Sequence, residues 1–588
     1  MIAKLTSFLL RRMTLKTDRI WLKNYPAEVP AEIDSQRFSS LAELFEQCFK
    51  TYPHRTAQTF MGKKFSYAQI DQFSMNIASY LQSVGLKKGD RVAIMMPNIP
   101  QYPVIATAIL RAGFILVNVN PLYTARELEH QLKDADVQAI FIAENFAHTL
   151  AEAMLTTPVR HVILTGIGDL IGGLKGWFIN KAIRFKGMVP NFDLPNSISL
   201  KEALLRGEYM LPDYQQPEIG PDDIAILQYT GGTTGVSKGA TLLHRNLVSN
   251  VLQVYAWILP ALKTNLSGKD QIVLVGALPL YHIFAFNVNL LITFYLGGNN
   301  ILIPNPRDLS SMLRELRRQP FHVLPAVNTL FNAIVNHPEA SSVNWSSLCL
   351  SVGGGMALQQ ATVQAWYKLT GCGMVEGYGM SETSPVICAS RVDITDVNDQ
   401  RMGIGYPVPS TTVVLRDDND QPVPLGTPGE ITVQGPQVMA GYWNSPEETA
   451  KVMTKDGFFR TGDIAVMDES GWIRIVDRKK DMILVSGFNV YPNEIEDVVA
   501  LMSGVEECVA IGVPSPKSGE AVMVLVVKKD PELTEEQVKQ WCKTRLTGYK
   551  RPRFVVFRES LPKSTVGKIL RRELRALLSE PADKTSQQ

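Results

Sequence analysis

The sequence lacks the cysteine and histidine spacings that form metal sites or disulfide frameworks. Its six cysteines are scattered without a C-x-x-C pair, at Cys48, Cys349, Cys372, Cys388, Cys508 and Cys542. The eight histidines show neither H-x-x-x-H nor H-E-x-x-H spacing. A zinc site and a disulfide scaffold are therefore not expected, and the cysteine usage fits a reducing cytosol.

The chain also lacks an excess of charge of either sign. Lys and Arg number 59 against 57 Asp and Glu, which gives a formal net charge of +2 for 588 residues. We find no nucleic-acid-binding motif, and this charge balance does not favour a nucleic-acid partner. The proportions of hydrophobic and charged residues are those of a globular protein, and the length allows more than one domain.

No segment is predicted to cross a membrane, although two segments bear on membranes. In residues 1–20 basic and apolar side chains alternate, but the apolar run is too short to span a bilayer, and no cleavage site follows it. This segment predicts either a basic amphipathic helix on anionic lipid or a disordered extension, with Met13 as an alternative start. Residues 272–296 are apolar but contain Pro279 and two asparagines, which favours a buried strand, a loop and a buried helix.

Strand and helix patterns alternate in the first part of the chain. Apolar runs at 91–96, 114–118 and 137–142 predict buried strands. A helix from Asn98 to about Arg111 and an amphipathic segment at 127–133 separate these runs. This rhythm predicts parallel sheet flanked by helices, and burial on both faces explains why the strands are apolar throughout.

The pattern changes later in the chain. Residues 166–211 are rich in Gly, Lys and Pro and predict an irregular surface excursion. After Asp393, short strands and turn signals predict a mainly β subdomain that ends near Asp477. The last hundred residues predict a compact α+β unit, with a helix from Glu494, two strands and a helix over 535–546. We find no internal repeats.

The strongest local signal is the segment 229–239, YTGGTTGVSKG, which follows an apolar strand at 223–228. Its glycines allow close backbone approach, its hydroxyls offer donors and Lys238 offers a positive charge, so the segment predicts a polyphosphate cradle. A Walker A loop is excluded, because Lys238 follows Ser237 and precedes Gly239. The alternative interpretation is a Gly/Thr-rich surface turn.

Further motifs follow this loop in a set order. They are Gly353-Gly-Gly355, GYGMSE at 377–382, Thr461-Gly-Asp463, DRKKD at 477–481 and PKSTVGK at 562–568. With the loop, they resemble the adenylate-forming superfamily of acyl-CoA synthetases, adenylation domains and luciferases. The resemblance extends from about Trp21 to Leu578 and is greatest to the bacterial long-chain fatty-acid–CoA ligase branch.

The resemblance implies an α/β fold. A large N-terminal domain of parallel-sheet α/β subdomains with a small β subdomain is followed by a small, mobile α+β C-terminal domain. The implied divisions are an extension at 1–20, a large ATP- and acyl-binding domain at 21–477, a hinge at 478–481 and a small domain at 482–588 that carries the catalytic lysine.

The resemblance also implies an ATP site. Tyr378 would pack on adenine, Asp463 and Arg478 would contact ribose, and Ser381, where most relatives have threonine, would contact the α-phosphate. Glu382 would bind Mg²⁺, which suits a hard carboxylate. The implied ATP-binding residues are Thr230, Gly231, Gly232, Thr233, Thr234, Gly235, Lys238, Gly353, Gly354, Gly355, Tyr378, Gly379, Ser381, Glu382, Asp463 and Arg478.

The remaining implied roles concern catalysis and the other two substrates. Lys568 is the catalytic lysine, assisted by Lys238 and Glu382, and Lys480 is the hinge. Tyr281 and His282 would border the acyl chain with Phe286 as the aromatic gate, where many long-chain relatives carry tryptophan. Ser486 and Gly487 would lie near the pantetheine of CoA.

These assignments imply an enzyme that activates long-chain fatty acids with ATP and Mg²⁺ and transfers them to CoA, releasing AMP and pyrophosphate. The alternatives are a fatty-acyl-AMP ligase that loads a carrier protein, an aryl or medium-chain acyl-CoA ligase, and a non-catalytic binding protein. A cytoplasmic location is expected, with peripheral association at the inner face of the membrane and a homodimer left open.

Overall fold

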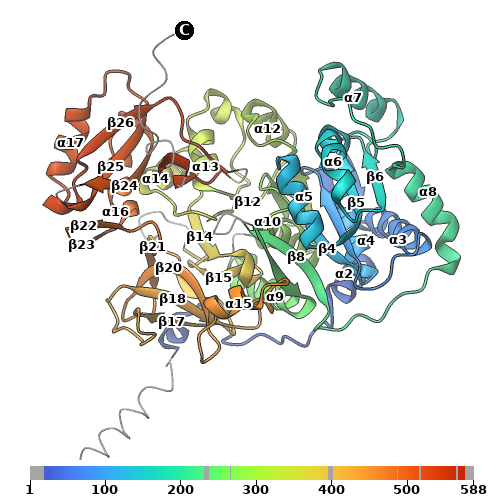
Figure 1. Cartoon of the computed structure of the whole chain (residues 1–588), viewed down its shortest axis with the longest axis horizontal. Helices are drawn as coiled ribbons and strands as arrows, with labels where there is room; N and C mark the ends of the chain where they lie inside the picture. The colour runs from blue at the N-terminus through green and yellow to red at the C-terminus, as the bar shows by residue number, and fades with distance from the viewer. Residues whose placement is uncertain are drawn as a thin grey trace, which may run out of the picture.

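The computed structural model describes residues 19–230, 237–264, 266–394, 401–486, 488–515, 518–564, 567–571 and 573–575. Over these residues the chain forms four β-sheets, which lie in sequence along the molecule with helices packed against them (Figure 1). The last sheet belongs to a lobe at the left of the view, set beside the larger body. The predicted α/β fold with a small C-terminal α+β unit is confirmed.

An eight-stranded sheet forms the core of the first part of the chain. In spatial order its strands are β19 (Gly441–Tyr442), β9 (Lys238–Leu243), β8 (Ile224–Thr230), β4 (Ile115–Asn118), β3 (Arg91–Met95), β5 (Val137–Ala143), β6 (His161–Thr165) and β7 (Ile198–Ser199). The strands from β8 to β7 run parallel, β9 is antiparallel to β8, and β19 is antiparallel to β9. The predicted strands at 91–96, 114–118 and 137–142 are confirmed, and all of β4 is buried, as expected for a sheet covered on both faces.

A nine-stranded sheet lies next to the first. Its order is β16 (Tyr406–Pro407), β15 (Val386–Ala389), β14 (Met374–Gly379), β13 (Leu350–Gly354), β12 (Val323–Ala326), β10 (Val273–Gly276), β11 (Asn299–Leu302), β1 (Thr56–Phe60) and β2 (Lys63–Ser66). The pairs from β14 to β1 are parallel. The carboxyl ends of β13 and β14 therefore lie at one edge, where ligands bind in open parallel sheets.

Two smaller sheets follow. The predicted β subdomain is an antiparallel sheet of β17 (Thr412–Arg416), β18 (Gly429–Gln434), β20 (Phe459–Met467) and β21 (Ile473–Arg478). The last sheet contains β23 (Phe488–Val490), β22 (Ile483–Val485), β25 (Gly519–Lys528) and β24 (Val505–Ser515), with β26 (Phe554–Arg558) parallel to β25. A turn after Arg478 connects the two sheets, at the position predicted for the hinge.

The helices cover the sheet faces. They are α2 (Leu41–Thr51), α3 (Tyr67–Ser83), α4 (Gln101–Arg111), α5 (Ala125–Asp134), α6 (Ala147–Ala153), α7 (Gly173–Phe185), α8 (Leu200–Met210), α9 (His244–Lys263), α10 (Ile283–Ala285), η5 (Phe286–Leu291), α11 (Ile292–Tyr295), α12 (Leu309–Leu316), α13 (Asn328–Val335), α14 (Gln360–Thr370), α15 (Pro446–Val452), α16 (Pro492–Ala500) and α17 (Glu535–Lys543). Local sequence explains several starts: Thr124 and Glu127 form a capping box at α5, as Thr534 and Gln537 do at α17.

The prediction of irregular structure over 166–211 is wrong, because this segment contains α7, β7 and α8. Two glycines explain the error. Gly207 lies inside α8, where a Cβ would come within 1.8 Å of the Asn76 backbone oxygen, and Gly176 lies inside α7, where a Cβ would meet the Gly168 oxygen at 2.3 Å. These glycines allow close helix packing, whereas in the sequence they resemble helix breakers.

The apolar segment 272–296 is a strand, a loop and a buried helix, as predicted, and its helical part includes the π-helical turn η5. Among the described residues, none of the helices combines the length and the hydropathy that a bilayer crossing needs. The N-terminal extension lies outside the described residues up to residue 18.

Candidate active site

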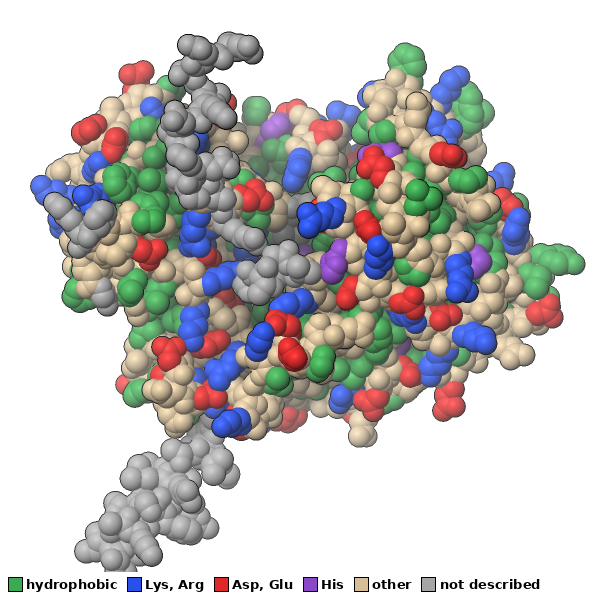
Figure 2. Space-filling model, in the orientation of Figure 1, with side chains coloured by type: hydrophobic (Ala, Val, Ile, Leu, Met, Phe, Trp, Pro, Cys, Tyr) green, Lys and Arg blue, Asp and Glu red, His purple; other side chains and the backbone are tan. Residues whose placement is uncertain are grey.

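A polar cavity of about 730 Å³ lies between the two large sheets, the β subdomain and the loop that carries Lys568. Its described lining includes seven cationic and four acidic side chains: Lys238, Lys451, Arg460, Arg478, Lys479, Lys480 and Lys568, with Glu382, Glu430, Glu448 and Asp463. In Figure 2, Lys and Arg side chains gather along the hollow between the left lobe and the body. This excess of positive charge suits a polyanionic ligand.

Two residues of the predicted phosphate loop line this cavity. Thr230 ends β8, Lys238 begins β9, and both line the cavity. Lys238 is ion-paired with Glu448, and its ammonium lies 5.6 Å from the centre of the Tyr442 ring. The predicted residues Gly231, Gly232, Thr233, Thr234 and Gly235 lie outside the described residues.

Glu382 and Ser381 line the same cavity, just after the end of β14. The Glu382 side chain is buried, and one of its oxygens accepts a hydrogen bond of 2.8 Å from the Tyr442 hydroxyl. Burial raises the pKa of Glu382, because a carboxylate that loses water favours its neutral form. A cation beside this carboxylate would offset that cost.

Asp463 is held from two sides. Its carboxylate accepts a hydrogen bond of 2.6 Å from the Tyr378 hydroxyl and lies 3.3 Å from Nε of Arg478. Asp463 and Arg478 line the polar cavity. Tyr378 is buried and lines a neighbouring apolar cavity, and it is not among the described residues that line the polar one.

Lys568 reaches the polar cavity from the C-terminal lobe. The Thr329 hydroxyl, in α13, donates a 3.0 Å hydrogen bond to the Gly567 oxygen and so connects this loop to the larger body. Burial, and next the nearby Arg478 guanidinium, lower the pKa of Lys568 to about 7. An anionic ligand between these cations would restore the charged form.

The structure separates the three consecutive glycines. Gly355, with φ of +77°, lines the polar cavity, whereas Gly353 and Gly354 are not among the described residues that line it. A Cβ on Gly353 would lie 2.4 Å from the Leu358 side chain, and one on Gly354 would lie 2.8 Å from the Phe284 ring. Both glycines therefore allow close packing behind the cavity.

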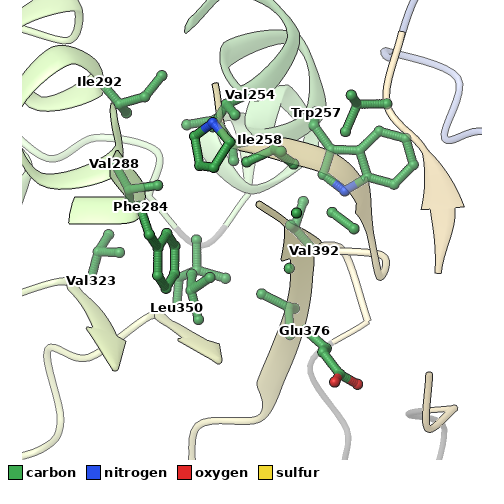
Figure 3. A pocket seen from close by; sticks show the side chains of 18 of the residues that line it. Val254, Trp257, Ile258, Phe284, Val288, Ile292, Val323, Leu350, Glu376 and Val392 are labelled. Carbon is green, nitrogen blue, oxygen red and sulfur yellow. The ribbon is translucent and has the colours of Figure 1, made fainter. Parts of the chain in front are cut away.

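An apolar cavity of about 110 Å³ shares part of its lining with the polar one, and Figure 3 shows this apolar cavity from close by. Its walls come from α9, η5, β12, β13 and β14, and the labelled apolar side chains surround it. The carboxylate of Glu376, whose pKa burial raises to about 7, points away from these side chains. Five residues line both cavities: His282, Phe284, Gly355, Gly379 and Met380.

The predicted acyl-site residues differ in position. His282 lines both cavities. Its pKa is lowered to about 4, mainly by burial and secondly by the nearby charge of Lys568, so the imidazole is neutral at pH 7. The backbone oxygen of Tyr281 accepts a hydrogen bond from Gln228. Phe286 is completely buried in the core and is absent from the described lining of both cavities, whereas Phe284 lines both.

The predicted hinge and CoA residues also separate. Lys480 lies in the turn after β21 and lines the polar cavity. Its pKa is lowered, mainly by burial and secondly by the nearby charge of Arg478. Ser486 is exposed on the C-terminal lobe and is not among the described residues that line either cavity. Gly487 lies outside the described residues.

Sequence reasoning missed two aromatic residues of this site. Phe284 follows His282 by two residues in the apolar segment, and only the fold shows which aromatic of that segment faces the cavities. Tyr442 contacts Glu382 from a strand 60 residues further along the chain, and no local motif signals this contact.

Comparisons with known proteins agree with this arrangement. Residues 45–443 match the family model of the AMP-binding enzyme, and residues 494–568 match that of the AMP-binding enzyme C-terminal domain. A long-chain-fatty-acid–CoA ligase of Escherichia coli O6:H1 is 54% identical over 560 residues, which cover 95% of this chain and 98% of the relative. A protein of the same name from Haemophilus influenzae is 48% identical with the same coverage.

Solved structures extend the comparison. ATP-bound MatB from Rhodopseudomonas palustris is 29% identical, with a TM-score of 0.73, and the match covers 92% of this chain and 99% of that one. The anthranilate CoA ligase AuaEII, at 21% identity and a TM-score of 0.78, shares the fold, over 94% of this chain and 98% of that one. The chain therefore belongs to the AMP-binding enzyme family.

Proposed function

We propose that the protein joins long-chain fatty acids to CoA with ATP, through an acyl-adenylate, and releases AMP and pyrophosphate. The observation that carries this proposal is the junction of the two cavities, where an apolar pocket meets a cationic one. An acid whose tail occupies the apolar cavity would present its carboxylate beside His282, at the boundary with the polar cavity. The relatives at 48–54% identity bear the name of this activity.

In the first step, a carboxylate oxygen attacks the α-phosphorus of ATP, and the bond to the β-phosphate oxygen breaks. Both reactants are anions, so their approach costs Coulomb energy. Lys568, Arg478 and Lys238 line the cavity, and their charges offset the repulsion. Asp463, whose carboxylate is held by the Tyr378 hydroxyl, accepts hydrogen bonds from the ribose hydroxyls.

Magnesium fits this site through Glu382. Among the described residues, no group of three or more His, Cys, Asp or Glu side chains could hold a metal ion. A single buried carboxylate suits Mg²⁺, which keeps several waters and binds through one or two carboxylates and substrate phosphates. When bound, Mg²⁺ would neutralise phosphate charge, and the Tyr442 hydroxyl would hold the Glu382 carboxylate in place.

In the second step the CoA thiol attacks the acyl carbonyl, the bond to AMP breaks, and the thiol proton is released. Lys568 fills part of the cavity in the present arrangement, and Ser486 is exposed away from it. We propose that the C-terminal lobe rotates about Lys480 between the steps and brings Ser486 and Gly487 to the pantetheine. Among the described residues, the Thr329 hydrogen bond to the Gly567 oxygen joins the Lys568 loop to the larger body, and this rotation would break it.

The acyl pocket must widen for a long chain. Its volume of about 110 Å³ is below the roughly 300–1,000 Å³ of pockets for drug-sized ligands. Phe284 stands at its junction with the polar cavity, and we propose that its ring, rather than that of Phe286, moves when the acid binds.

Two alternatives keep the fold and change a substrate. A feruloyl-CoA synthase of Amycolatopsis is 33% identical over 89% of this chain and 96% of the relative, so an aromatic acid is the runner-up. A carrier protein in place of CoA is the other. Peripheral membrane association and a homodimer are proposals that vesicle binding and light scattering test.

The experiment is thioester formation by the purified protein with ATP, Mg²⁺ and CoA, across alkyl acids from short to long, plus ferulic and benzoic acids. Lys568→Ala is compared with Lys563→Ala, because Lys563 is paired with Glu507 outside the described cavity lining. We expect thioester with long alkyl acids and loss only in Lys568→Ala. Pyrophosphate release without thioester would transfer the acceptor role to a carrier protein, and no pyrophosphate with any acid would refute the catalytic proposal.

A further inference from the structure

Helix α7 exposes a large apolar surface to solvent. Its exposed side chains include Leu174 (77%), Trp177 (54%), Phe178 (60%) and Phe185 (92%), and Met188 just beyond the helix is 54% exposed. Residues at these spacings in an α-helix fall on one face, because 3.6 residues complete a turn. Exposed apolar residues that occur singly are ordinary, but a contiguous stripe of this kind indicates an interaction surface.

The opposite face of α7 fixes the helix to the body. Gly176 packs against the Gly168 backbone, and the Asn180 side chain accepts a hydrogen bond of 2.7 Å from the Gly168 N–H and donates one of 2.7 Å to Asp169. The apolar face is therefore directed outward by specific contacts. Figure 1 shows α7 at the upper right, at the periphery of the body, and Figure 2 shows hydrophobic side chains with Lys and Arg side chains over that region.

The charged residues of α7 itself and of the turn after it have one sign. Residues 172–188 contain no Asp or Glu and four cations: Lys175, Lys181, Arg184 and Lys186. Lys181 lies 4.8 Å from the centre of the Trp177 ring, within the stripe, while Arg184 is paired with Glu144 at its side. Aromatic and aliphatic residues framed by basic ones are the composition of helices that lie in the interface of an anionic bilayer.

We propose that α7 docks the protein on anionic lipid, with Trp177, Phe178 and Phe185 inserted among the acyl chains. A second copy of the chain is the competing occupant, but a two-fold interface would place the same surface on both sides. The lysines of one copy would then face those of the other, whereas phosphate headgroups complement them. The reason for such docking, access to acids that partition into lipid, rests on the proposed function, but the docking itself does not.

The test measures binding of the full chain to vesicles of phosphatidylcholine alone or with one third phosphatidylglycerol. We compare the double variant Phe178→Ser/Phe185→Ser with Leu205→Ser/Tyr209→Ser, which removes equally exposed apolar side chains from the neighbouring helix α8. We expect about tenfold or greater loss of the partition coefficient for the α7 variant and little change for the control. Circular dichroism and thermal unfolding verify that each variant is folded.

Charge is tested separately with Lys181→Glu/Lys186→Glu. We expect its binding to fall mainly on vesicles with phosphatidylglycerol, and wild-type binding to weaken between about 0.1 M and about 1 M salt, as the Debye length falls from about 10 Å to about 3 Å. The proposal would be overturned if the wild-type protein did not bind anionic vesicles, or if the α7 variant bound them as the wild type does. A dimer by light scattering that the α7 variant abolishes would assign the surface to a second copy and overturn it too. Thioester formation without vesicles reports separately on the proposed function.

Discussion

The close contact between Gly354 and the Phe284 ring offers a sharp test of the acyl site. A methyl group added by Gly354→Ala would lie 2.8 Å from a ring carbon and 3.1 Å from the Gly377 backbone oxygen. The backbone of a central strand moves little, so the ring must move, and this ring lines both cavities. The substitution therefore places the ring where the acid has to pass.

The cost of such overpacking is typically about 1–3 kcal/mol. If it falls on acid binding, kcat/KM for a long alkyl acid decreases roughly 5- to 150-fold, at about 1.4 kcal/mol per factor of ten. The KM for ATP should remain unchanged. The assay is steady-state thioester formation with each substrate varied in turn.

The matched control is Gly377→Ala on the adjacent strand, where the nearest atom to a new Cβ is 3.8 Å away. We expect only a small effect there. Phe284→Leu should relieve Gly354→Ala in a double-mutant cycle, because the smaller side chain removes the overlap. A rise in the KM for ATP with unchanged kinetics for the acid would instead favour the predicted ATP contact at Gly354 and refute our reasoning.

Three further predictions concern charge. Because the pKa of Lys568 is lowered to about 7 in the fold, its buried positive charge destabilises the ligand-free fold fully below about pH 7, and this cost disappears above the ordinary lysine pKa. Lys568→Met should therefore raise the thermal midpoint by a few degrees at pH 6–7, and the difference from wild type should fade toward pH 10–11. A difference that does not depend on pH would contradict this. Glu382→Gln should lower the rate of pyrophosphate release about 100-fold or more and raise the Mg²⁺ needed for half-maximal rate, whereas Tyr442→Phe should lower the rate only a few-fold; equal effects would refute the metal role. Asp463→Asn should raise the KM for ATP about tenfold without changing that for the acid, because a charge-assisted hydrogen bond is worth about 1.5–3 kcal/mol; a changed KM for the acid alone would refute the ribose contact.

Sequence patterns predicted the fold where one local signal dominated. The strand at 91–96 and the helix after it are largely apolar, as burial between layers requires, and both are present. The prediction for residues 166–211 failed because Gly176 and Gly207 allow close packing, which depends on the residues across the contact. Such a partner, the Asn76 backbone for Gly207, is distant in sequence.

The site shows the same division. Motif residues such as Glu382, Asp463 and Lys568 line one cavity, although they come from separate parts of the chain. The choice between Phe284 and Phe286 could not be read from the sequence, because both follow His282 in an apolar run that includes a π-helical turn. Their directions are set by the irregular turn and not by a regular period.

The five residues shared by the two cavities have a thermodynamic consequence. His282, Phe284 and their neighbours form one wall for both ligands. A rearrangement of this wall by one ligand therefore changes the affinity for the other. Linkage then requires reciprocity: the factor by which the acid changes the affinity for ATP equals the factor by which ATP changes the affinity for the acid. Affinities measured for one substrate alone will therefore differ from those in the ternary complex by a single coupling free energy, and substitutions at this wall will change that coupling as well as either affinity.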